Sequence, residues 1–336
     1  MGSIEEVKPW IEAGNLLGEG PVYLASSDEL CWIDIAGKTI SKSQIGVTVP
    51  DQEIHSLPEI STVIAEIEGR PDELILGTEN GFAIWNWSEK SFKPIVEIWR
   101  GDPVLGKKSR LNDGNVDIRG RFWAGSMIGM FGADEVGKSS LYRLDSDLSL
   151  HTMLTGVSIA NGLGWSPDNK VMYFADSQDQ TVWAFDFDAE TGSIENRRVF
   201  YRHEGKAVPD GLAVDAEGNV WLALWEGYAL LQISPKGKIV RKLDLPVSRV
   251  TCPCFGGPDL DELFVTTAML NPERPEEAGL EGSVFRFKPG VKGQPRNKDQ
   301  DFLVTNLWND TRGNAAKKDK SKKNRMKRMK RNNGNR

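Results

Sequence analysis

Disulfides and histidine-based metal sites have little support in this sequence, because cysteine and histidine are both scarce. The 336 residues include three cysteines and three histidines. Cys31, Cys252 and Cys254 are too few and too unevenly spaced to cross-link a secreted fold of this size, which favours a reducing, cytoplasmic environment. No histidine lies in an HExxH pattern, so the zinc-hydrolase helix of that type is excluded.

Long apolar runs and targeting segments are also missing. No stretch approaches the roughly 20 apolar residues that a membrane span needs. The first residues, MGSIEEVKPW, lack the charged and apolar regions of a signal peptide. Gly2 resembles a myristoylation start, but position 6 is Glu6 where Ser or Thr is expected. We therefore expect a soluble protein with no membrane anchor.

Motifs for the common nucleotide and nucleophile chemistries are absent too. The chain has no P-loop, and Gly162-Leu163-Gly164 does not continue into a dinucleotide fingerprint. The nearest approach to a nucleophile elbow, residues 156–160, lacks its second glycine. Nucleotide-dependent chemistry and a Ser-His-Asp mechanism are both disfavoured.

Charge is distributed very unevenly. The net charge is −6, yet residues 312–336 carry 12 Lys and Arg against one Asp. The acidic remainder argues against a nucleic-acid-binding face on the fold, so only the tail could bind a polyanion, and weakly. We expect a folded domain over residues 1–311 and a basic, disordered tail over 312–336. Such Lys/Arg clusters are also typical of nuclear-localisation signals.

A recurring unit organises the chain. Each copy has a small residue, alternating apolar positions, a polar turn and an apolar cluster, and its apolar anchors recur every 43 to 50 residues. The anchors are Trp32, Leu76, Trp123, Tyr173, Trp221 and Phe264. With further strand-like runs between copies, each unit supplies about four strands, the content of a propeller blade. The prediction is an all-β, six-bladed β-propeller, because a β-sandwich or two barrels would not give a steady period.

Four copies carry an oxygen donor immediately before the glycine of the repeat: Glu19, Asp113, Asn161 and Asp210. If this position opens the innermost strand, the four donors converge near one end of the central channel. Converging carboxylates repel one another unless a cation or shared protons neutralise them. Carboxylate and amide oxygens suit Ca²⁺, Mg²⁺ or Mn²⁺ better than a structural Zn²⁺ site. The alternative is that each residue only caps a strand or turn.

Five segments give the chain a family resemblance. LLGEGPVY, RLNDGNVDIRGRFWAGSM, NGLGWSPDNKVMYFADS, PDGLAVDAEGNVWLA and CFGGPDLDELFVTTA, in this order, resemble the gluconolactonase, regucalcin and luciferin-regenerating enzyme family over about residues 15 to 295. The resemblance implies a six-bladed propeller with one Ca²⁺ or Zn²⁺ in its channel and hydrolysis of a sugar-type lactone.

The resemblance also implies roles for individual residues. By it, the metal ligands are Glu19, Asn161 and Asp210, and the substrate contacts are Arg110 and Asn112, with Asp113 beside them. Sugar-lactone members often carry an acidic residue shortly after the GRFWAGSM segment. This chain has Met127-Ile128-Gly129-Met130 there, so Met130 is expected to contact the substrate in a more apolar pocket.

The expected reaction is metal-dependent opening of a lactone to its hydroxy acid. The metal, with Ca²⁺ ahead of Zn²⁺, Mg²⁺ or Mn²⁺, would stabilise the charge that develops on the carbonyl oxygen, and Asp210 would accept the proton of the attacking water. The alternative is a calcium-binding regulatory propeller without turnover. Arg110 favours the enzyme, because a purely structural metal site needs no such residue. The oligomeric state is not predicted.

Overall fold

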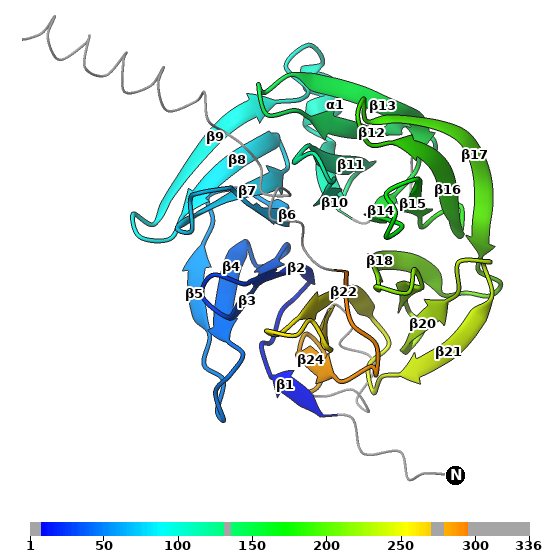
Figure 1. Ribbon diagram of the computed structural model, residues 1–336. Helices are drawn as coiled ribbons and strands as arrows, with labels where there is room; N and C mark the ends of the chain where they lie inside the picture. The colour runs from blue at the N-terminus through cyan, green and yellow to red at the C-terminus, as the bar shows by residue number, and fades with distance from the viewer. Residues whose placement is uncertain (1–7, 131–135, 270–278, 295–336) are drawn as a thin grey trace, which may run out of the picture.

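A computed structural model describes residues 8–130, 136–269 and 279–294 of the chain. Six four-stranded antiparallel sheets are arranged as blades around a central axis (Figure 1). The expected all-β, six-bladed propeller is confirmed. Among the described residues the only helix is the short α1 (Pro103–Gly106), and no helix is long and apolar enough to cross a membrane.

Five blades are continuous in sequence, and in each the chain runs outward from the axis strand by strand. The first blade contains β2 (Gly18–Leu24), β3 (Glu29–Asp34), β4 (Thr39–Gln44) and β5 (Glu53–Ser56). The second contains β6 (Ser61–Glu66), β7 (Glu73–Thr78), β8 (Gly81–Asn86) and β9 (Ser91–Glu97). The third contains β10 (Ser109–Val116), β11 (Phe122–Ile128), β12 (Ser139–Leu144) and β13 (Leu150–Val157). The fourth blade contains β14 (Ala160–Trp165), β15 (Val171–Asp176), β16 (Thr181–Asp188) and β17 (Ser193–Arg202). The fifth contains β18 (Val208–Val214), β19 (Val220–Trp225), β20 (Ala229–Ile233) and β21 (Ile239–Asp244).

The sixth blade joins the two ends of the domain. Its strands are β22 (Val250–Gly256), β23 (Glu262–Thr267), β24 (Val284–Phe287) and, outermost, the N-terminal strand β1 (Pro9–Ile11). Pro9 pairs with Phe285, and Ile11 with Val284. Backbone hydrogen bonds between the first and the last described strand therefore close the ring.

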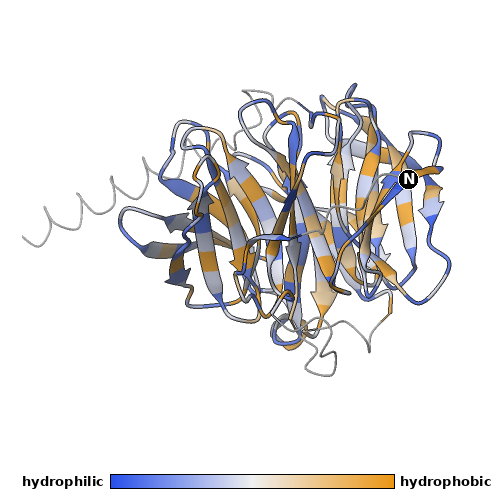
Figure 2. Ribbon diagram, turned by 90° about the horizontal axis from the view of Figure 1, so that it is seen from below, coloured by the Kyte–Doolittle hydropathy of each residue, from blue (hydrophilic) through white to orange (hydrophobic). Residues whose placement is uncertain are grey.

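The apolar anchors of the repeat mark the second strand of every blade, as their even spacing predicts. Trp32, Trp123, Trp221 and Phe264 are completely buried on β3, β11, β19 and β23, and Leu76 on β7 is buried equally. Strands show alternating apolar and polar bands along their length (Figure 2), the period-two pattern of a sheet with distinct faces.

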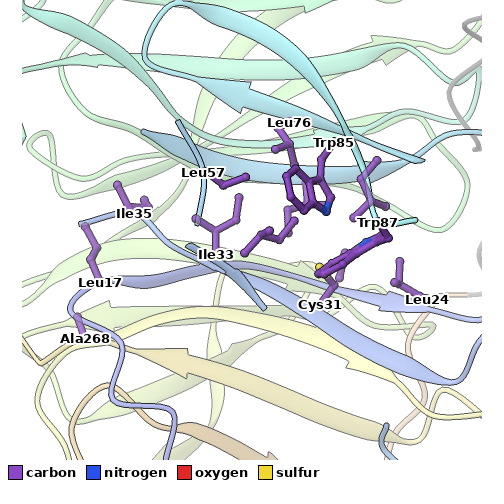
Figure 3. Close-up of a cluster of buried hydrophobic side chains, with 14 residues drawn as sticks. Leu17, Leu24, Cys31, Ile33, Ile35, Leu57, Leu76, Trp85, Trp87 and Ala268 are labelled. Atoms are coloured by element: carbon purple, nitrogen blue, oxygen red, sulfur yellow. The ribbon is translucent and has the colours of Figure 1, made fainter. Parts of the chain in front are cut away.

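The core lies between neighbouring blades. In the cluster between the first two blades, Ile33 of β3 faces Leu76 of β7 and Trp85 of β8 (Figure 3). Leu17 and Ile35 lie at one end of this cluster, beside Ala268. The apolar packing between blades thus extends to the end of the domain at which the first strand of each blade begins.

Truncation of the basic tail after Thr311 should leave the melting temperature almost unchanged. The tail lies outside the described residues, and all six blades and every candidate site residue lie upstream of it. Differential scanning calorimetry of the truncated and full-length chains measures the effect. A large loss of stability would show that residues 312–336 pack on the propeller.

Candidate metal centre and substrate cavity

The first strands of the six blades surround the axis, and each contacts the first strands of the neighbouring blades (Figure 1). In every blade the pairing of the first strand with the second shifts register within three residues of the strand's start. Such bulges bend a strand and redirect its side chains. The repeated bulge therefore lies near the start of each first strand, where the candidate oxygen donors are found.

The pairing of the first strand with the second shows that the donors before the repeat glycines are not all at equivalent positions, as the alignment of the repeats assumes. Val22, Val116 and Val214 each lie opposite the residue that precedes an anchor tryptophan. Counting back three residues from each valine gives Glu19, Asp113 and Gly211. Asp210 is therefore one position earlier than Asp113.

Asn112 and Asn161 share the position of Asp210. Leu111, Ala160 and Pro209, the residues just before them, each pair three residues beyond an anchor. Asn112, Asn161 and Asp210 therefore share one level, whereas Asp113 is the next residue along β10 and Glu19 pairs with Ile33, one residue beyond its own anchor.

One cavity brings together most of the predicted site. It has a volume of about 140 Å³, and Glu19, Arg110, Asn112, Asn161 and Asp210 line it, as does Met130. Each of the five polar residues is less than 10% exposed. The three predicted metal ligands and three of the predicted substrate contacts, Arg110, Asn112 and Met130, therefore share one cavity.

Asp113 faces a different space. It lines a second cavity of about 190 Å³ on the channel, together with Asn115, Cys252, Cys254 and Gln294. Its Oδ1 accepts a hydrogen bond from Gly114 N at 2.6 Å. The structure thus places Asp113 apart from Arg110 and Asn112, although the three residues are almost adjacent in sequence.

Burial and mutual repulsion dominate the electrostatics of the carboxyl groups. Burial, followed by the charges of Asp210 and Asp113, raises the pKa of Glu19 well above its ordinary value. Burial and then Asp113 raise the pKa of Asp210 in the same direction, and burial raises the pKa of Asp113 to about 6. Glu19 and Asp210, which line the same cavity, both resist ionisation, so a cation bound there would stabilise the site.

Arg110 supplies a positive charge that acts on both Glu19 and Asp210. Burial lowers its pKa to about 10, and the two carboxylates oppose that shift. Its Nη1 donates to Asn112 Oδ1 at 2.6 Å, and its Nη2 donates to the Met130 carbonyl at 2.9 Å. Asn112 Nδ2 in turn donates to the Ala160 carbonyl at 2.7 Å. The guanidinium is thus held by residues of its own blade, and Asn112 connects it to the fourth blade.

Asn161 provides the clearest sign that the donor set fits a metal. Its Nδ2 donates to Ser177 Oγ at 2.8 Å, whereas its Oδ1 is buried without a hydrogen-bond partner among the described residues. An unsatisfied buried oxygen is unfavourable, and a cation would satisfy it. No group of three His, Cys, Asp or Glu side chains with metal-binding geometry occurs in the described ranges, so a site here depends on this amide oxygen.

Ser177, which the repeat pattern did not single out, orients the Asn161 amide and should tune metal affinity. Replacing Ser177 with alanine is expected to weaken metal binding by about 10- to 100-fold, because the amide loses the partner that fixes it. Isothermal titration calorimetry with Ca²⁺ provides the measurement. Ser177→Thr keeps the hydroxyl and is the matched control; equal affinities for the alanine variant and the wild type would remove this role.

The metal-free protein should lose stability as the pH rises from about 4.5 to about 7.5. Glu19, Asp113 and Asp210 have raised pKa values in the folded state, so over this range the folded protein holds protons that the unfolded chain has released. The melting temperature of chelated protein should therefore fall with pH, and Ca²⁺ should reduce the fall. Asp113→Asn should also reduce it; a melting temperature that rises over this range in chelated protein would contradict the expectation.

Comparisons with known proteins agree with this architecture. A family model described as SMP-30/Gluconolactonase/LRE-like region matches residues 17–269. Regucalcin of Danio rerio is 34% identical, over 88% of this chain and 98% of that protein. Among solved structures, a luciferin-regenerating enzyme aligns with a TM-score of 0.77 and 32% identity, covering 85% of this chain and 96% of its own. A regucalcin from Agrobacterium tumefaciens, described as a calcium-binding protein, aligns with a TM-score of 0.77 and 26% identity over 86% of this chain and 95% of its own.

Proposed function

Since this chain belongs to the SMP-30/gluconolactonase/LRE-like family, we propose that it is a divalent-metal-dependent lactonase that opens a lactone ring to the hydroxy acid. One observation carries the proposal: three oxygen donors and a buried arginine line the same cavity. The oxygen donors suit a metal, and the arginine suits a polar group of a substrate.

Glu19, Asn161 and Asp210 would hold the cation. Their carboxylate and amide oxygens suit Ca²⁺ first, and the calcium-binding regucalcin relative supports that choice; Zn²⁺, Mg²⁺ and Mn²⁺ are the alternatives. When bound, the cation supplies Lewis-acid stabilisation of the charge that develops on the lactone carbonyl oxygen.

The side chains of the cavity perform the remaining steps. Asp210 accepts the proton of the attacking water, a role that suits a carboxylate with a raised pKa. Arg110 and Asn112 orient the lactone by donating hydrogen bonds to its oxygens. Because Arg110 is already fixed by Asn112 and the Met130 carbonyl, little side-chain freedom is lost when the substrate binds.

A lactone panel with defined metals tests the proposal. The protein is chelated, verified as metal-free by elemental analysis, and assayed with added Ca²⁺, Zn²⁺, Mg²⁺ or Mn²⁺. Turnover that requires an added metal is the expected result. Undiminished turnover in metal-free protein would refute metal dependence.

A second candidate function is calcium binding without turnover. The name of the calcium-binding relative favours it, and the same three ligands would serve. Arg110 discriminates between the two, because a site that only binds calcium gains nothing from a buried cation beside its ligands. Tight Ca²⁺ binding with no hydrolysis of any lactone would favour this alternative.

The setting of the protein is also proposed. None of the three cysteines, all of which lie in the described ranges, forms a disulfide, and two are buried, which suits a reducing, cytoplasmic compartment. The molecule that binds in the cavity is a small lactone.

A further inference from the structure

The cavity has one polar side and one apolar side. Leu17, Ile35, Met127, Met130 and Trp225 are among its apolar lining residues. Four of these five, all except Met127, also belong to the hydrophobic cluster that packs between the first two blades or contact it. Figure 3 shows Leu17 and Ile35 at one end of that cluster. The apolar wall is thus a continuation of the core into the cavity.

The polar lining residues are already engaged. Glu19, Asn161 and Asp210 are the proposed ligands, and Ser177 is bonded to Asn161. Arg110 and Asn112 are bonded to one another, and their remaining donor groups, among them the Arg110 Nε, are assigned to the lactone ring itself. No other polar side chain in the described part of the chain lines this cavity. A lactone bearing several hydroxyls would therefore bury groups without partners, which is unfavourable.

Trp225 is the largest residue of the apolar wall, and its surroundings hold it in place. It ends β19 and forms an isolated bridge with Arg249. The guanidinium carbon of Arg249 lies 5.1 Å from the centre of the Trp225 ring, and its Nε donates to Glu226 Oε1 at 2.7 Å. Glu226 has a φ of 60°, so the chain turns sharply immediately after the tryptophan.

From this arrangement we propose that the substrate is a lactone with a hydrocarbon substituent, and that Trp225 is the specificity-determining residue that contacts the substituent. The inference rests on the proposed lactonase function. The lactone ring lies on the polar side, within reach of Arg110, and the substituent lies along Trp225 and Met130. Aromatic side chains recognise hydrocarbon groups through large apolar contact at little entropic cost.

Binding of lactams tests the inference without depending on turnover, because lactams resist hydrolysis. Calorimetry on the calcium-loaded protein compares 2-pyrrolidinone with 5-hexyl-2-pyrrolidinone. Each methylene buried on the wall should tighten binding by about fourfold. Trp225→Ala should remove at least about tenfold of the preference for the hexyl compound. Trp225→Phe, which keeps an aromatic ring, should retain most of it and guards against a folding defect.

Trp183→Ala is the matched control. Trp183 is also half-buried beneath an arginine, with Arg197 at 3.7 Å from its ring centre, but it lies on β16 and does not line the cavity. It should leave both lactam affinities unchanged. Equal effects of the two alanine substitutions, or equal binding of the two lactams by the wild type, would overturn the inference.

Turnover of γ-butyrolactone, γ-decalactone and glucono-δ-lactone completes the test. The expected order of kcat/KM places γ-decalactone first, with that rank lost in Trp225→Ala. Faster hydrolysis of glucono-δ-lactone would overturn the substrate assignment. If no lactone is hydrolysed but the lactam preference depends on Trp225, the proposed reaction fails while the recognition role of Trp225 is supported.

Discussion

Replacing Asp210 with alanine should reduce lactone turnover by at least about a thousandfold and remove tight metal binding. Asp210 lines the cavity with the other two proposed ligands, and as the proposed proton acceptor it would act in the reaction as well. Glu19→Ala should have the same effect on metal binding. The measurements are kcat/KM on a lactone and a calorimetric titration with Ca²⁺.

Neither variant should unfold the propeller. Both remove a buried carboxyl group whose ionisation burial disfavours, so the melting temperature of the chelated variants should match or exceed that of the chelated wild type. Asp186→Ala, which changes an exposed carboxylate paired with Arg198, serves as a control and should leave binding intact. Full metal affinity in Asp210→Ala would exclude this residue as a ligand.

Arg110→Ala should reduce kcat/KM by about a hundredfold while the metal site remains filled. Arg110 cannot ligate a cation, and its charge lowers the pKa values of Glu19 and Asp210. Its removal makes the site more negative, so metal affinity should hold or increase. Measuring metal affinity and kcat/KM on the same variant separates the two effects.

Arg110→Lys is the matched control for this prediction. It keeps a positive charge but cannot make both the Asn112 and the Met130 contacts in the same fork geometry. We expect its kcat/KM to lie between those of the wild type and Arg110→Ala. An unchanged kcat/KM in Arg110→Ala would remove the residue from the substrate site.

The blade architecture could be predicted from the sequence because each blade repeats the same local pattern. The anchors Trp32, Trp123 and Trp221 follow a polar turn at a constant spacing, and burying them requires the second strand of each blade. The one-residue offset between Asp113 and Asp210 could not be predicted in this way. An alignment on glycine assumes that the glycines are equivalent, whereas the inter-strand hydrogen bonds decide which residues share a level.

Two residues of the cavity were missed for a related reason. Ser177 follows the second strand of the fourth blade and Trp225 ends that of the fifth, whereas the repeat pattern directed attention to the first strands. Residues at these two strand ends meet only when the blades are assembled around the axis. The sequence does contain a signal for Ser177, since it ends the NGLGWSPDNKVMYFADS segment that also contains Asn161.

The pairing of β1 with β24 has a consequence for the order of events during synthesis. Glu19 leaves the ribosome early, and it can meet both Asn161 and Asp210 only after the next three blades and the first strand of the fifth have been made. The ring cannot lock until Phe285 is available to Pro9. A ribosome-bound fragment that ends before β24 would therefore contain every proposed ligand yet lack the closure that holds the first blade in position. Tight calcium binding should therefore begin only after β24 has left the ribosome. Bound calcium would then distinguish chains with a closed ring from shorter ones.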